Sequence, residues 1–224
     1  MKEEVKDLIK YRELSKYLNL IPGFIHNLNT PLMSISGRIE LIKFKIPDLQ
    51  GIDQILQQLE KINNTINVVK YMIEKDKIES KQKIDLITFI DIFDQFLNLN
   101  LTYKHKIKLE KEIEEGATID ILPFMILNIL YEIFDNCINA MEDGGVIKLK
   151  IYRDAARIYF EVHRSGHNIP EDLVKIVNGK TTPKLEGENL LDLIVAKSMI
   201  EDLDGKIKVK NQPNGVEYLF NLPK

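Results

Sequence analysis

The residues with the most evident chemical capability lie in one short stretch, His26 to Leu32, with the sequence HNLNTPL. The imidazole of a histidine titrates near neutral pH and can act as a nucleophile or as a general base. Apolar residues on both sides of this stretch recur at alternating steps of four and three, which is the spacing of a helix seam. They are Ile21, Ile25, Leu28, Leu32, Ile35, Ile39, Ile42 and Ile46. His26 falls beside this seam, so the pattern predicts a solvent-facing imidazole on a long helix.

The neighbours of the histidine are unusual for a helix. Asn29 and Thr30 fall one turn after His26 on the same side. Pro31 has no N–H for the carbonyl of Asn27, and an interior helical proline costs roughly 3 kcal/mol. We therefore expect the helix to bend just after the histidine. For an arbitrary histidine and proline, a solvated surface residue and a tolerated kink are the simpler interpretation.

A second segment repeats the seam. Its apolar positions are Ile52, Ile55, Leu59, Ile62, Ile66, Val69 and Ile73. The link between the segments contains Pro47 and Gly51, which both destabilise a helix. Residues 1–80 are therefore predicted to form an antiparallel helical hairpin. One hairpin is too thin to bury both apolar stripes, which predicts a homodimer with a four-helix bundle.

The pattern changes after the charged stretch that follows Ile73. Helices are expected near residues 86–98, 123–141 and 189–203, and strands near 105–113, 146–152, 158–163, 206–209 and 217–222. Helices and strands mix without strict alternation, which favours a two-layer α+β sandwich over a doubly wound sheet. The predicted second domain is residues 81–224.

Composition narrows the class of protein. The net charge of −3 argues against bulk nucleic-acid binding. The single cysteine, Cys137, excludes an intramolecular disulfide framework and suits a reducing compartment. No apolar run approaches the length of a membrane span, and the first residues are charged and unlike a secretion signal. We expect a cytoplasmic protein without membrane insertion, and 224 residues leave no room for a sensor domain.

The stretch around His26 resembles the phosphoacceptor box of two-component sensor histidine kinases, in which a histidine precedes a polar residue, then Thr or Asn, Pro and Leu. The resemblance implies that His26 carries a phosphoryl group and that the hairpin is the dimerisation and phosphotransfer element. It implies a response-regulator receiver domain as partner, with Thr30 positioning a water for its dephosphorylation. The main kinase group has Glu or Asp as a base where this chain has Asn27. Asn27 cannot take a proton, so autophosphorylation from ATP is expected to suffer.

The helix ending in EIFDNCINAM resembles the conserved box of the kinase ATP-binding domain, which gyrase-like and heat-shock-chaperone-like ATPases share. Glu132 and Asn136 then face the nucleotide from successive turns. One would orient a water or hydroxyl, and Asn136 would ligate Mg²⁺ through its amide oxygen. Without the resemblance, the same residues are equally well read as the polar face of an amphipathic helix.

Other boxes of the resemblance are incomplete. Where the family has an Asp that accepts the adenine amino group, this chain has Arg164, whose guanidinium has no acceptor. Gly166 is the glycine that remains of the next pair. The lid that cradles the phosphates keeps at most Gly187 and gains two carboxylates, Glu188 and Asp192. The nucleotide contacts therefore look lost while the scaffold looks kept.

Three functions remain open. The first is a degenerate kinase core that relays phosphoryl groups through His26 to or from a receiver, with no cofactor. The second is a sensor kinase and phosphatase that uses ATP and Mg²⁺ through Glu132 and Asn136 and takes its input from a separate sensor protein. The third is a non-catalytic dimeric regulator of a kinase or receiver. The histidines outside the hairpin lack metal-ligand spacing, so no metal site is expected there.

Overall fold

The structure is a computed structural model that describes residues 3–47, 49–76, 78, 80–179 and 191–224. The chain divides into two compact units, with the boundary between Ile73 and Glu74. None of the helices in these ranges is both long and apolar enough to span a membrane.

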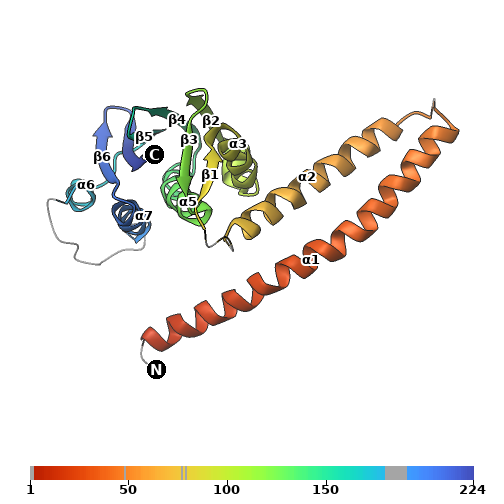
Figure 1. The fold of residues 1–224 in the computed structure, drawn as a ribbon, viewed down its shortest axis with the longest axis horizontal. Coiled ribbons are helices and arrows are strands. Elements are labelled where there is room, and N and C mark those ends of the chain that lie inside the picture. The colour runs from red at the N-terminus through yellow and green to blue at the C-terminus, as the bar shows by residue number, and fades with distance from the viewer. Residues whose placement is uncertain (1–2, 48, 77, 79, 180–190) are drawn as a thin grey trace. The chain divides into compact units, whose positions relative to one another are not determined.

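The first unit is built from two helices, α1 (Glu3–Lys45) and α2 (Ile52–Asp76). They run in opposite directions from the turn at Gly51, whose φ of +87° is a left-handed conformation that glycine adopts without strain (Figure 1). The α-helix continues through Pro31 without interruption, as one gently curved ribbon. A helical hairpin is therefore present, and the proline is accommodated within it.

The seam residues of the hairpin have two different environments. Ile25, Ile52, Leu59 and Ile66 are buried. Large apolar side chains of the same helices remain exposed, among them Ile35, Ile42, Ile55 and Ile62. The unit therefore buries part of its predicted stripe and presents the rest to its surroundings.

The second unit contains a five-stranded mixed sheet in the order β2-β4-β5-β7-β6. The strands are β2 (Ile107–Ile113), β4 (Gly145–Arg153), β5 (Arg157–Ser165), β6 (Lys206–Gln212) and β7 (Gly215–Pro223). β2 and β4 are parallel, and the other pairs are antiparallel. A separate two-stranded sheet pairs β1 (Gln82–Asp85) with β3 (Thr118–Ile121).

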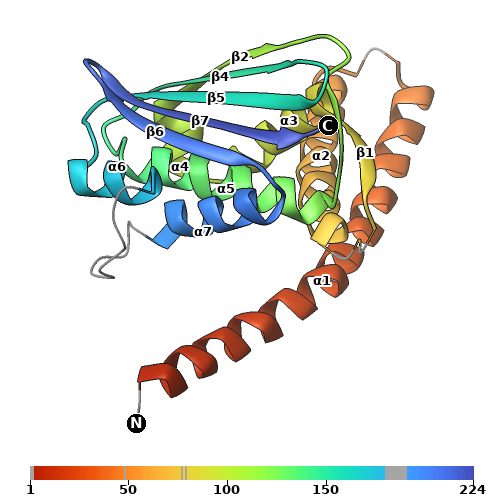
Figure 2. The same ribbon diagram turned by 60° about the vertical axis from the view of Figure 1, so that its left-hand side comes forward.

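The helices of this unit cover one face of the five-stranded sheet (Figure 2). They are α3 (Leu86–Leu97), α4 (Leu101–Lys106), α5 (Pro123–Asn139), α6 (Glu171–Val177) and α7 (Leu191–Asp202). Alternate strand residues face these helices, and the rings of Phe160 and Phe220 stack there with centroids 4.5 Å apart. Phe93 and Phe134 meet edge to face at 5.3 Å between α3 and α5. The predicted two-layer α+β arrangement is confirmed.

Several short elements differ from the sequence prediction. The strand expected from residue 105 begins at Ile107, because the preceding residues form α4. The side chain of Asn100 starts this helix by accepting hydrogen bonds from the backbone N–H groups of Thr102 and Tyr103. The strands β1 and β3 and the helix α6 were not predicted, since elements of four to seven residues give little periodicity.

Edge strand β6 is covered by side-chain amides. The amide of Asn178 bonds to both backbone groups of Val209, at 2.8 and 2.9 Å. In turn, the amide of Asn211 bonds to both backbone groups of Ile169, at 2.9 and 3.0 Å. These pairs fix the segment that contains α6 along the edge of the sheet and satisfy part of an otherwise open strand edge.

Candidate functional site

His26, Asn27 and Thr30 lie on α1 with exposed side chains. The Thr30 hydroxyl donates a hydrogen bond to the His26 carbonyl at 3.2 Å, a common local contact of threonine in helices. This bond holds the threonine side chain one turn from the histidine and leaves its oxygen lone pairs available to solvent. The imidazole of His26 is therefore exposed in the structure, as the sequence predicted.

Glu132 lies on α5 with a partly buried carboxyl. Burial raises its pKa, and the carboxylates of Asp192 and Asp135 raise it further. Asp135 in turn accepts a hydrogen bond from the side-chain amide of Asn139 at 2.9 Å. The exposed side of α5 and the first turn of α7 thus carry a concentration of negative charge, which disfavours an incoming phosphate group.

Asn136, one turn after Glu132, points in a different direction. Its side chain is 7% exposed, and its amide oxygen accepts a hydrogen bond from the hydroxyl of Tyr218 at 2.8 Å. Burial raises the pKa of Tyr218, so this hydroxyl stays protonated and remains a donor. The oxygen expected to bind Mg²⁺ is therefore engaged inside the core, and the two residues of the box do not share one environment.

Arg164 completes this buried cluster from strand β5. Its side chain is 1% exposed, and its Nε donates to the Tyr218 hydroxyl at 3.4 Å. Its Nη1 donates to the carbonyls of His167 at 2.7 Å and Ser165 at 3.4 Å. The chain turns back over the guanidinium at Gly166, which has a φ of +102°. Arg164, Tyr218 and Asn136 thus form one hydrogen-bonded chain across β5, β7 and α5, which we call the buried polar cluster.

The donor set does not fit ATP and Mg²⁺ as the resemblance requires. Asn136 presents an occupied, buried oxygen, whereas Mg²⁺ needs accessible oxygen ligands in near-octahedral geometry. Arg164 offers donors where adenine recognition needs an acceptor. In the ranges that the structure describes, no group of three or more His, Cys, Asp or Glu side chains is placed to hold a metal ion. The lid residues Gly187 and Glu188 lie outside the described residues.

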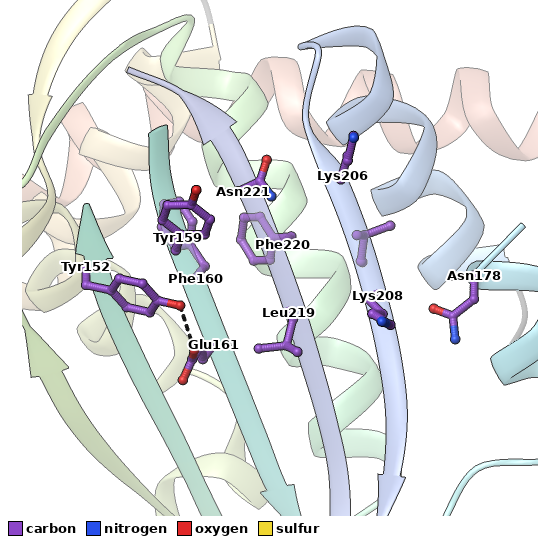
Figure 3. A pocket seen from close by; sticks show the side chains of 11 residues that line it. Tyr152, Tyr159, Phe160, Glu161, Asn178, Lys206, Lys208, Leu219, Phe220 and Asn221 are labelled. Carbon is purple, nitrogen blue, oxygen red and sulfur yellow. Dashed lines mark hydrogen bonds between the residues drawn. The ribbon is translucent and has the colours of Figure 1, made fainter. Parts of the chain in front are cut away.

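A hollow of about 660 Å³ lies on the opposite, open face of the sheet (Figure 3). It is lined by residues of β4, β5, β6 and β7 and by Asn178. The rings of Tyr152 and Tyr159 stack at 5.1 Å, and the Tyr152 hydroxyl donates to Glu161 at 2.8 Å. This hollow contains none of the predicted site residues.

Sequence reasoning missed Tyr218, the residue that connects Arg164 to Asn136. The signal was available in the period-two alternation of Val216, Tyr218 and Phe220, which places all three on the buried face of one strand. A tyrosine hydroxyl on a buried face requires a hydrogen-bond partner. The sequence did not show that this partner would be Asn136.

Residues 122–224 match the family model described as histidine kinase-, DNA gyrase B- and HSP90-like ATPase. The sensor protein KdpD of Clostridium acetobutylicum is 24% identical over all of this chain and 26% of its own length. Sporulation kinase C of Bacillus subtilis is 23% identical over 90% of this chain and 47% of its own length. The chain therefore spans about a quarter to a half of these relatives.

Solved structures of histidine kinases are also similar to this chain. The catalytic domain of histidine kinase ThkA is 26% identical, with a TM-score of 0.56, over 65% of this chain and 96% of that domain. ThkA in complex with the response regulator protein TrrA matches the fold of the whole chain with a TM-score of 0.53 at 21% identity, over 67% of that structure's chain. Together these relationships show that residues 122–224 are similar to the histidine kinase-type ATPase domain, and that the chain is similar to the catalytic core of two-component histidine kinases.

Proposed function

We propose that this protein is a two-component phosphotransfer protein in which His26 exchanges a phosphoryl group with an aspartate of a response-regulator receiver domain. Two observations carry the proposal. The first unit has an exposed histidine on a long helix, and the second unit, of the histidine kinase-type ATPase family, has a nucleotide box whose asparagine is buried. The ThkA–TrrA complex supports a receiver as the partner.

The transfer balances without ATP. A neutral ring nitrogen of His26 attacks the phosphorus of an aspartyl phosphate on the receiver. The new N–P bond forms as the P–O bond to the aspartate breaks, and the aspartate leaves as a carboxylate. The other ring nitrogen gives up its proton to water when the neutral phosphohistidine forms. The reverse reaction follows the same steps, so the protein can pass the group to a second receiver.

Asn27 and Thr30 support this direction of chemistry. Asn27 cannot remove a proton from the imidazole, so it does not assist phosphorylation from ATP. Thr30 has a hydroxyl one turn from His26, already oriented by its bond to the His26 carbonyl. We assign it the role of positioning a water for hydrolysis of the receiver's aspartyl phosphate.

The exposed apolar side chains of the hairpin support the proposal that a second copy of this chain is its partner. Ile55 is 49% exposed and Ile62 is 45% exposed, on a helix whose Leu59 is buried. Leaving large aliphatic side chains in water forgoes about 1.5–3 kcal/mol each. A symmetric four-helix bundle would cover them. We therefore propose a homodimer formed through α1 and α2.

The experiment is phosphoryl transfer from receiver domains of the same organism, charged with acetyl phosphate, to the purified protein. The wild type is expected to gain an acid-labile, base-stable label, and His26→Gln is expected to lose it. His105→Gln is the matched control, because His105 is an exposed helical histidine in the other unit. Equal labelling of wild type and His26→Gln would refute the proposal. Labelling of His26 from Mg-ATP in the absence of a receiver would instead show that the protein is a kinase.

A further inference from the structure

We propose that Arg164 is a built-in substitute for a bound nucleotide: it holds the buried polar cluster and the turn at residues 165–168 closed, so the ATPase-type domain is complete without ATP. The inference concerns residues 74–224 only. It deepens the proposed function, because it explains why transfer through His26 needs no nucleotide. It does not depend on His26 being the acceptor.

The first argument is the placement of the guanidinium. Arg164 is among the largest fully buried side chains of the chain, at 1% exposure. Placing a charged group in the core is expensive unless its donors are bonded. Its hydrogen-bond partners in the part of the chain that the structure describes are the Tyr218 hydroxyl and the carbonyls of Ser165 and His167, which are neutral. Among the described residues, the charge is therefore held by hydrogen bonds to neutral groups.

The second argument is the effect on Asn136. Through Tyr218, the guanidinium lies two hydrogen bonds from the amide oxygen that would have to bind Mg²⁺. A divalent cation would have to reach a side chain that is 7% exposed, share its oxygen with the Tyr218 hydroxyl, and accept the repulsion of a nearby buried cation. These effects oppose binding of Mg²⁺ at Asn136. The cluster therefore occupies the position and also makes it electrostatically unsuitable.

The third argument is the turn that follows Arg164. Gly166 adopts a φ of +102°, and this conformation brings the His167 carbonyl to 2.7 Å from Nη1. A Cβ on Gly166 would lie 3.8 Å from Nη1, so the turn lies directly against the guanidinium. Beyond the turn, Ile169 is bonded through both backbone groups to Asn211. The segment is thus ordered at both ends by the protein's own side chains, a task for which no ligand is required.

The test compares the wild-type chain of residues 1–224 with Arg164→Lys, Arg164→Met and the control Arg157→Met. Arg157 lies on the same strand, and its guanidinium bonds to the Asp204 carbonyl and the Asn221 side chain, away from Asn136. Thermal unfolding, hydrogen exchange of residues 165–169 and calorimetric titration with Mg-ATP are measured for each. Arg164→Lys keeps the charge but loses the forked donors, so it reports on the cluster even if Arg164→Met does not fold.

For the wild type we expect no heat of binding, no change in Tm and no change in exchange with millimolar Mg-ATP. For Arg164→Lys we expect a fall in Tm of several degrees and at least tenfold faster exchange at residues 165–169, with a smaller effect in Arg157→Met. Saturable 1:1 binding of Mg-ATP to the wild type would overturn the inference. Exchange at residues 165–169 that is no faster in Arg164→Lys than in Arg157→Met would overturn it as well. If the wild type accepts no phosphoryl group from a receiver but the results above are as expected, the proposed role of His26 is wrong and this inference stands.

Discussion

Removing the hydroxyl of Tyr218 should destabilise the second unit far more than removing the hydroxyl of an exposed tyrosine. In Tyr218→Phe, the aromatic ring stays in the core, but the 2.8 Å bond to the Asn136 oxygen and the 3.4 Å contact from Arg164 are lost. Tyr218 is fully buried and Asn136 is 7% exposed, so water does not replace the donor easily. The change therefore isolates one element of the buried polar cluster.

The magnitude follows from the group that is left behind. A hydrogen bond contributes about 1 kcal/mol net, and a buried acceptor without a partner costs about 1–3 kcal/mol. The bond from the Arg164 Nε is long, but its loss also leaves a buried donor without the Tyr218 hydroxyl, which favours the upper part of this range. We expect a loss of about 1–3 kcal/mol in the free energy of unfolding. For a domain of this size, that corresponds to a fall in Tm of about 3–9 °C.

The assay is differential scanning calorimetry of the full chain, with Tyr159→Phe as the control. Tyr159 donates a hydrogen bond to Asp154 at 2.7 Å, as Tyr218 does to Asn136, but on the open face where water can replace it. The control should change stability by no more than about 0.5 kcal/mol. If Tyr218→Phe and Tyr159→Phe lower Tm equally, the buried polar cluster does not stabilise the domain and the argument from burial is wrong.

Two further predictions test the acidic face and the dimer. Burial, Asp192 and Asp135 raise the pKa of Glu132, so its ionisation opposes folding, and the folded protein loses stability as pH rises through that raised pKa. Glu132→Gln should therefore raise Tm at pH 7. Calorimetry at several pH values should show that this gain vanishes well below the ordinary glutamate pKa of about 4.3. A gain in Tm that is the same at low pH would contradict this cause. Replacing Ile55 and Ile62 together with Glu should convert a dimer to a monomer in analytical ultracentrifugation, whereas glutamates at the exposed Gln57 and Gln58 should not, and an unchanged dimer would contradict the proposed interface.

Local patterns in the sequence were enough to predict the long elements. Apolar residues at alternating steps of three and four predicted α1 around His26 and α2 between Ile52 and Ile73. This is possible because a side chain repeats its direction every 3.6 residues regardless of what it packs against. Period-two alternation located β4, β5 and β7, and the helix with Glu132 and Asn136 was placed close to its observed bounds. Short elements such as α4 and α6 were missed, since six or seven residues do not complete two turns.

The chemistry of the nucleotide box was decided by tertiary structure. From the sequence, Glu132 and Asn136 were expected to face one ligand together, and Arg164 was seen only as a residue that cannot accept a hydrogen bond from adenine. The sheet register pairs Arg164 with Val216, which places Tyr218 diagonally across from Arg164 on the same face. The packing of α5 then brings Asn136 to Tyr218 across 82 residues of sequence. A helical repeat shows which residues share a face, but the partner of a buried polar group is fixed only when distant strands and helices pack together. The sequence by itself determined that this chain carries His26 on a helical hairpin. The tertiary packing decided that Asn136 is hydrogen-bonded to Tyr218 of the same domain.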